Sequence, residues 1–79
     1  MRILFFAQVK DAVGAAELVV AISGQPGVEA LWDQLVGMQP KLAPFRQTTR
    51  LARNGEYADA GTIFSDADEV ALIPPVSGG

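Results

Sequence analysis

Cysteine and histidine are both absent from this chain of 79 residues. Without cysteine there is no disulfide framework, no thiolate zinc site and no thiol nucleophile. Without histidine the chain lacks the side chain that most often titrates near neutral pH. The groups that remain for chemistry are nine carboxylates, six lysines and arginines, one tyrosine and a few hydroxyls. The sequence therefore offers few of the side chains that usually act in enzyme catalysis.

Positive charge and long apolar runs are also scarce. The formal net charge is -3 and the pI is about 4.6, which disfavours nucleic acid as a main partner. No run approaches the roughly 20 apolar residues of a membrane helix. The apolar run near the start is cut by Gln8 and Lys10 and has no cleavage-site pattern after it. We therefore expect a cytoplasmic protein that binds neither nucleic acid nor a membrane.

The apolar pattern changes from strand to helix and back along the chain. Apolar positions at Val28, Leu31, Trp32, Leu35 and Val36 have helical spacing, and Pro40 ends that helix near Met38 or Gln39. Lys10 to Gly14 are expected to form a loop or a helical turn, and 40–48 an irregular connection. Asn54-Gly55 predicts a tight hairpin. The predicted strands cover residues 2–8, 16–22, 49–53, 56–59 and 69–74.

This order of elements predicts an α+β fold. One main helix covers one face of a mixed sheet of four to five strands, with the first and last strands parallel in the centre. That arrangement is the β-grasp, or ubiquitin-like, architecture. Residues 1–73 are predicted to form the domain, and residues 74–79 an extended Gly-Gly tail.

Two charged clusters have ordinary explanations. The acidic residues Asp66, Asp68 and Glu69 would suit a metal or an acid/base pair, but this pattern before a strand is more typical of a solvated turn. The basic residues Lys41, Arg46, Arg50 and Arg53 would guide an acidic partner or form a solvated face. We predict no metal site.

The central strands predict a second, uncovered face of the sheet. Strand alternation places the residues Leu4, Phe6, Ala71 and Ile73 away from the helix. Because one helix covers only one face, these apolar side chains are expected to form a partner interface. The alternative is that loop 40–48 folds over them.

The sequence ends in "PPVSGG". Pro74 and Pro75 forbid helix and favour an extended chain. Glycine has no Cβ, so a Gly78-Gly79 tip fits a narrow channel. Pro74 to Gly79, including Val76 and Ser77, would reach about 20 Å and present the α-carboxylate of Gly79. The alternative is a frayed end.

The two ends of the chain resemble a known family. "ILFFAQVKDAVG" and "DEVALIPPVSGG" are similar to the small, sulfur-carrying subunit of molybdopterin synthase, the MoaD family, which is related to the ThiS sulfur carriers and to ubiquitin. The resemblance covers the whole chain, and its Pro-Pro before Gly-Gly is specific. This chain has Lys10 where the family often has Arg, which keeps the charge but not the bidentate fork of arginine.

The resemblance implies a sulfur carrier of molybdenum cofactor synthesis that is not catalytic alone. In the family an E1-like enzyme uses ATP to adenylate the terminal carboxylate, here Gly79. A sulfur donor protein then converts it to a thiocarboxylate. The tail enters the large synthase subunit and gives sulfur to cyclic pyranopterin monophosphate. The assembly is a heterotetramer, and no cofactor is permanently bound. Lys10 would join the apolar face as a partner contact.

Two other functions remain open on the sequence. The same tail chemistry serves sulfur carriers for thiamine or a tungsten cofactor, and ubiquitin-like protein modifiers. The other open function is a binding module with an unreactive tail. The sequence does not distinguish the acceptor, the sulfur donor or the final metal.

Overall fold

The computed structural model describes residues 1–75 of the chain. Its elements alternate between strands and helices, and the segment after α2 is a 3-10 helix labelled η1. In chain order they are β1 (Arg2–Phe5), α1 (Ala7–Val13), β2 (Glu17–Val19), α2 (Val28–Met38), η1 (Pro40–Phe45), β3 (Arg50–Arg53), β4 (Glu56–Tyr57) and β5 (Glu69–Ile73).

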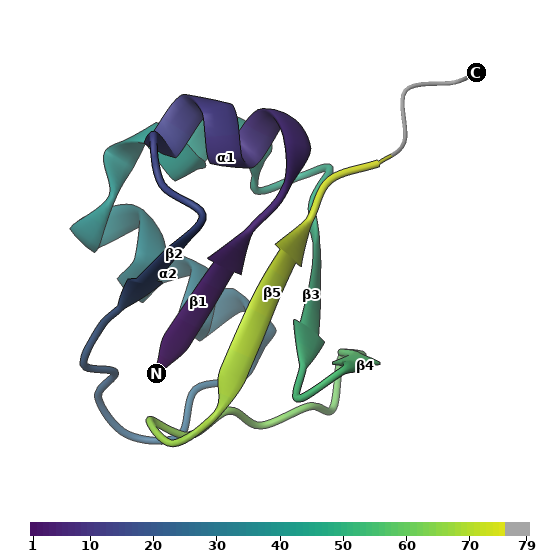
Figure 1. Ribbon diagram of the computed structural model, residues 1–79. Helices are drawn as coiled ribbons and strands as arrows, with labels where there is room; N and C mark the ends of the chain where they lie inside the picture. Colours follow the sequence, from purple (N-terminus) through teal and green to yellow (C-terminus); the bar gives the residue numbers. More distant parts are fainter. Residues whose placement is uncertain (76–79) are drawn as a thin grey trace.

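The strands form one mixed sheet with the order β2-β1-β5-β3-β4 (Figure 1). β1 and β5 lie side by side in the centre and are parallel, with Ile3 opposite Val70 and Phe5 opposite Leu72. The other three pairings are antiparallel. The predicted β-grasp architecture, including its parallel central pair, is confirmed.

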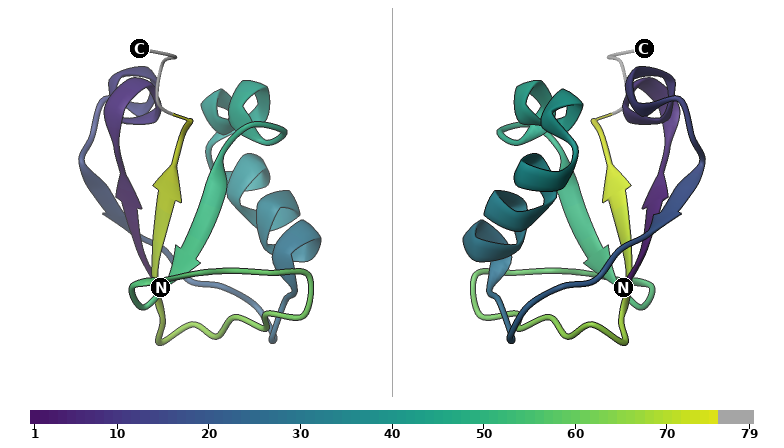
Figure 2. Two further views of the ribbon diagram at one scale, coloured as in Figure 1. Left: turned by 90° about the vertical axis from the view of Figure 1, so that its right-hand side faces the viewer. Right: turned by 90° about the vertical axis from the view of Figure 1, so that its left-hand side faces the viewer.

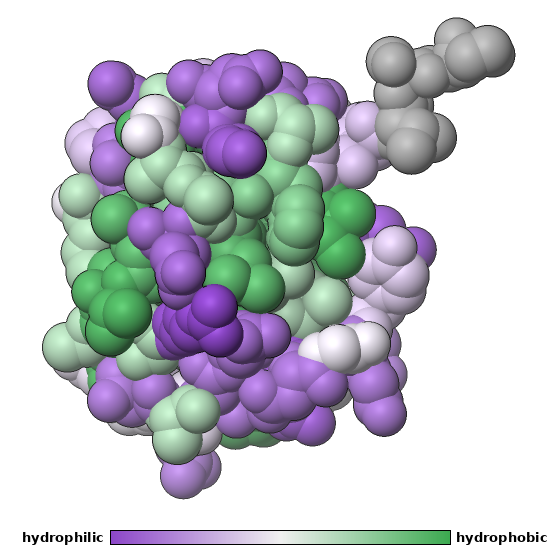
Figure 3. Space-filling model, viewed as in Figure 1, coloured by the Kyte–Doolittle hydropathy of each residue, from purple (hydrophilic) through white to green (hydrophobic). Residues whose placement is uncertain are grey.

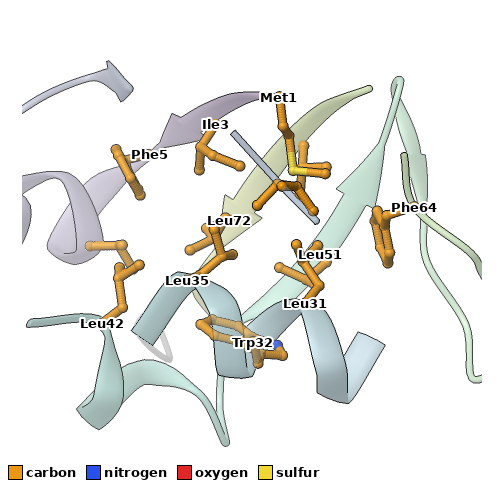
Figure 4. Packing of buried hydrophobic residues seen from close by; sticks show 13 residues of the cluster. Met1, Ile3, Phe5, Leu31, Trp32, Leu35, Leu42, Leu51, Phe64 and Leu72 are labelled. Atoms are coloured by element: carbon orange, nitrogen blue, oxygen red, sulfur yellow. The ribbon is translucent and has the colours of Figure 1, made fainter. Parts of the chain in front are cut away.

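The core lies between this sheet and α2. Leu31, Trp32 and Leu35 of α2 are buried, and the Trp32 side chain is only 2% exposed. They pack against the alternate residues of the sheet that point toward α2, among them Ile3, Phe5, Leu51 and Leu72 (Figure 4). The observed bounds of α2 match the predicted helix, since its apolar stripe and Pro40 define both the face and the end. The predicted core position of Trp32 is confirmed.

The Asn54-Gly55 turn also forms as predicted. Both residues have positive φ, 50° and 89°, which is the conformation that the mirror-image hairpin turn requires. The Asn54 side chain then joins the turn to the start of β5. Its Nδ2 donates to Asp68 Oδ1 at 3.0 Å, and its Oδ1 accepts the Glu69 N–H at 2.9 Å. β4 ends at Tyr57, two residues before the predicted end.

The first strand is shorter than predicted and a helix follows it. β1 ends at Phe5, so the expected strand over 2–8 is wrong from Phe6 onward. Ala7 has φ 49°, which turns the chain into α1, and Gly14 ends α1 in the left-handed conformation. Val9 is buried, and one buried residue in a seven-residue helix gives too weak a period to be read from sequence. β2 likewise covers only Glu17–Val19.

The segment 40–48 does not cover the second face of the sheet. It contains η1, whose Leu42 is buried in the same cluster as Phe5 and Leu35. Figure 4 shows Leu42 on the side of the sheet that bears α2. α1 lies at the end of the sheet at which β1 and β5 finish, and α2 stands along one side of the strands (Figure 2). The alternative in which this loop closes the apolar surface is therefore wrong.

Candidate functional site

No helix covers the face of the sheet opposite α2 among the described residues, although Ala52 on this face is only 6% exposed. We call this face the open face. It consists of the outward-pointing residues of the five strands, which the pairing register places together: Arg2, Leu4, Glu17, Val19, Arg50, Ala52, Tyr57, Glu69, Ala71 and Ile73. Figure 3 looks onto this face and shows apolar surface over the central strands, interrupted on one side by hydrophilic residues.

An apolar strip runs along the middle of the open face. Leu4 lies opposite Ala71, and Ala52 lies on the other side of Ala71. Ile73 is at the end of β5, and Leu4, Ala71 and Ile73 are each half-buried between their neighbours. The structure thus brings together three of the predicted interface residues. Their role as an interface remains a prediction.

Phe6 and Lys10 lie at the end of this strip but outside the strands. Phe6 is extended and precedes α1, where its carbonyl accepts the N–H groups of Val9 and Lys10 at 3.1 and 3.2 Å. Its side chain is 46% exposed and alternates with the buried Phe5, which directs it away from the core. Lys10 is exposed on α1. Both residues sit at the end of the sheet where β5 finishes.

The last described residues are Pro74 and Pro75, which continue directly from β5. Pro74 is buried and Pro75 is exposed. Since proline has no N–H, neither residue can donate another ladder hydrogen bond to β3. Val76, Ser77, Gly78 and Gly79 lie outside the described residues, so the threading tail and the reactive carboxylate stay predictions.

A cluster of charges on the open face was not predicted. The Arg2 guanidinium donates to Glu17 on β2 at 2.5 Å and to Glu69 on β5 at 2.8 Å. The hydrogen bond and charge of Arg2 hold the pKa of Glu17 below its usual value, and Glu17 in turn raises the pKa of Arg2. Strand alternation places Arg2 on the same face as Leu4, and the registers of β2 and β5 bring its two carboxylate partners beside it.

The acidic segment before β5 forms a turn. Asp68 Oδ2 accepts the Ser65 N–H at 2.8 Å, and Asp66 Oδ1 accepts the Ile22 N–H at 2.8 Å. These backbone hydrogen bonds are the main reason that the pKa of each carboxyl is lowered. Within residues 1–75 no group of three or more His, Cys, Asp or Glu side chains is arranged to hold a metal ion. The Asp68 N–H also donates to the Ser65 carbonyl at 3.0 Å, which closes the predicted turn.

The basic residues after α2 do not gather into one surface. Arg46 donates to Asp33 of α2 at 2.8 Å and to Glu29 at 3.1 Å, whereas Arg53 donates to the Ile63 carbonyl at 2.6 Å. Arg50 stacks over the Tyr57 ring, 4.0 Å from its centroid. The interpretation of these residues as a single guiding patch is wrong.

None of the helices in residues 1–75 has the length and hydropathy needed to cross a membrane.

Known proteins resemble this chain in both sequence and architecture. Residues 3–79 match the model of the ThiS family. The chain is 36% identical to the molybdopterin synthase sulfur carrier subunit of Escherichia coli, covering all of this chain and 99% of that protein. It is 33% identical to the Arabidopsis thaliana subunit of the same name, covering all of this chain and 82% of that protein. The crystal structure of SAMP1 from Haloferax volcanii, 32% identical, superposes with a TM-score of 0.81 over 99% of this chain and 97% of that one. The chain belongs to the ThiS family.

Proposed function

We propose that this protein is the sulfur carrier of molybdopterin synthase and that the carboxyl group of Gly79 carries the sulfur. The observation that carries the proposal is the similarity, over the whole chain, to subunits named as molybdopterin synthase sulfur carriers. The sequence pattern supports it, because "PPVSGG" follows directly on the central strand β5. The shortage of catalytic side chains agrees with a subunit that supplies a reactive end and not an active site.

The chemistry begins with activation, because a free carboxylate is a poor electrophile. A carboxylate oxygen of Gly79 attacks the α-phosphorus of ATP on an E1-like enzyme, which forms the acyl-adenylate and releases pyrophosphate. A persulfide on a sulfur donor protein then attacks the acyl carbon, and AMP leaves. A second thiol of the donor cleaves the resulting acyl disulfide, which releases the thiocarboxylate and leaves a disulfide on the donor. Its ionised sulfur is the nucleophile, as in a thiolate. Transfer of that sulfur to cyclic pyranopterin monophosphate, with hydrolysis of the acyl group, restores the carboxylate.

The large synthase subunit would supply the acid, base and phosphate-binding groups. In this proposal the open face docks on that subunit through Leu4, Phe6, Ala71 and Ile73, with Lys10 beside them. Pro74 and Pro75 direct the tail into the partner's channel, and Val76, Ser77 and Gly78 pass through that channel. Two sulfurs are needed for each dithiolene, so two loaded carriers serve each product in a heterotetramer. ATP belongs to the activating enzyme, and the reactions take place in the cytoplasm.

Intact mass tests the proposal directly. The protein is co-expressed with the E1-like enzyme of its own organism and a sulfur source, and the expected mass change is the replacement of one oxygen by sulfur at Gly79. An unchanged mass, under conditions that load a known carrier, would contradict the proposal. A variant with one alanine added after Gly79 is the matched control. It should fold and bind the large subunit but remain unloaded.

A second candidate function is protein modification. The chain is 34% identical to small archaeal modifier protein 1 from Haloferax volcanii, over 94% of both chains. A modifier would use the same activated carboxylate but pass it to a lysine amine, which forms an isopeptide bond. Conjugates that survive a denaturing gel and disappear in a variant lacking Gly78-Gly79 would favour this function. Sulfur transfer for thiamine or a tungsten cofactor would instead show as thiocarboxylate loading without support of molybdopterin synthesis.

A further inference from the structure

An ionic bridge spans three neighbouring strands on the open face. Arg2 of β1 binds Glu17 of β2 through Nε and Glu69 of β5 through Nη1. One positive and two negative side chains leave a net charge of about -1 at this corner. Arg2 is held by hydrogen bonds from both sides, and each carboxylate keeps acceptor positions that Arg2 does not fill. We call these three residues the acidic bridge.

The opposite corner of the open face carries the other sign. Arg50 lies across from Ile73 at the end of β5, and its guanidinium stacks over the Tyr57 ring. The ion pairs found within residues 1–75 do not include Arg50. Stacking fixes the guanidinium but does not neutralise it, so this corner is positive.

The two corners are far enough apart to act separately. The acidic bridge is centred on Arg2 of β1, and the Arg50 guanidinium lies over the Tyr57 ring of β4, three strands from β1 in the sheet order, or about 14 Å across the strands. β3, which bears Arg50, is also two strands away from β1, which bears Arg2. This separation exceeds the Debye length of about 8 Å at physiological salt. The apolar strip of Leu4, Ala71 and Ile73 lies between the corners.

We propose that this charge pattern docks the partner in one orientation. The partner presents a lysine or arginine to the acidic bridge and an aspartate or glutamate to Arg50, on either side of an apolar patch that covers the strip. A docked partner removes water from both corners, and an unpaired charge left there is costly. The reversed orientation would place like charges together at both corners. This inference rests on the proposed function, which makes the large molybdopterin synthase subunit the partner.

The orientation matters because of where the tail leaves the domain. Arg50 is paired with Ile73, the residue immediately before Pro74. A partner carboxylate on Arg50 therefore fixes the position of the partner surface beside the base of the tail. The acidic bridge fixes the far end of the same surface. Together they would set the direction in which Pro74 and Pro75 point into the partner.

Association kinetics with the purified large subunit of the same organism test this inference. The first variant, Glu17→Gln with Glu69→Gln, removes both carboxylates of the acidic bridge. The second is Arg50→Gln. The matched control, Glu29→Gln with Glu56→Gln, changes the formal charge equally, from -3 to -1, at α2 and at the side of β4 that points away from the open face. On-rates are measured at low and high salt, with the unfolding midpoint of each variant as a check on folding.

Both the bridge variant and Arg50→Gln should lower the on-rate, by about 3-fold or more at low salt, and high salt should reduce the difference. The control should change it less than 2-fold. A simple attraction by net charge would instead move the bridge variant and Arg50→Gln in opposite directions, and that result would overturn the inference, as would equal effects of bridge and control. If the wild-type protein fails to bind the large subunit at all, it is the proposed function that fails.

Discussion

The two faces of the central strands β1 and β5 differ in what covers them, although alternate residues of the same strands supply both. On β5, Leu72 is fully buried against α2 while its neighbour Ala71 is half-buried on the open face. On β1, Ile3 and Phe5 belong to the core, whereas Arg2 and Leu4 face outward. Strand alternation thus separates the residues that hold the fold from those available to a partner. Substitutions on the two faces should have different consequences.

The largest effect on stability is expected on the covered face. Leu72→Ala should lower the free energy of unfolding by about 2–5 kcal/mol, because it removes buried methyl groups and leaves a cavity. Leu4→Ala makes the same chemical change on the open face and should cost less than about 1.5 kcal/mol, since Leu4 is half-exposed. Urea denaturation of both variants measures the difference. Equal losses would mean that the open face is part of the core.

A charged residue on the open side should harm binding more than folding. Phe6→Asp places a carboxylate at an apolar contact beside the tail and should weaken binding to the large subunit by 10-fold or more, about 1.4 kcal/mol. Its effect on unfolding should be smaller, because the Phe6 side chain is 46% exposed. Calorimetric titration and denaturation together provide the test. Gln8→Asp, an exposed substitution on α1, is the control. A stability loss as large as the loss of binding would place Phe6 in the core.

The next prediction concerns a polar residue on the covered side. Thr49 is 7% exposed, and its Oγ1 has no hydrogen-bond partner among residues 1–75. Thr49→Val replaces the hydroxyl by a methyl group of similar size and should raise the free energy of unfolding by about 1 kcal/mol. Thr48→Val, at an exposed neighbour whose hydroxyl contacts the Phe45 carbonyl at 3.4 Å, should give no such gain. A loss of stability in Thr49→Val would reveal a partner for the hydroxyl.

Sequence patterns were informative where one local rule decided the structure. The stripe from Val28 to Val36 with Pro40 defined α2, and Asn54-Gly55 defined the hairpin. They failed from Phe6 to Gln8, which were predicted as strand, because α1 begins at Ala7 and its one buried residue, Val9, gives too weak a period. The helical turn considered for Lys10 to Gly14 is the second half of α1 and its cap. The ionic contacts of Arg2 could not be predicted either. They join residues 15 and 67 positions apart, which only the register of three strands brings together.

The smallest expected effect concerns Asp68 in the turn before β5. The Ser65 N–H, with the Asn54 amide and the charge of Arg53, holds the pKa of Asp68 below its usual value against a partial burial that opposes this. A carboxyl whose pKa is lower when folded stabilises the fold above its unfolded pKa, about 3.9, and loses this contribution as the pH falls through the folded value. Asp68→Asn should therefore lower stability at pH 7 and flatten the decline below about pH 4. Urea midpoints between neutral and acidic pH measure this slope. Asp11→Asn, which removes an exposed carboxyl from α1 and changes the net charge equally, is the control, and an equal flattening there would assign the acid sensitivity to net charge and not to the turn.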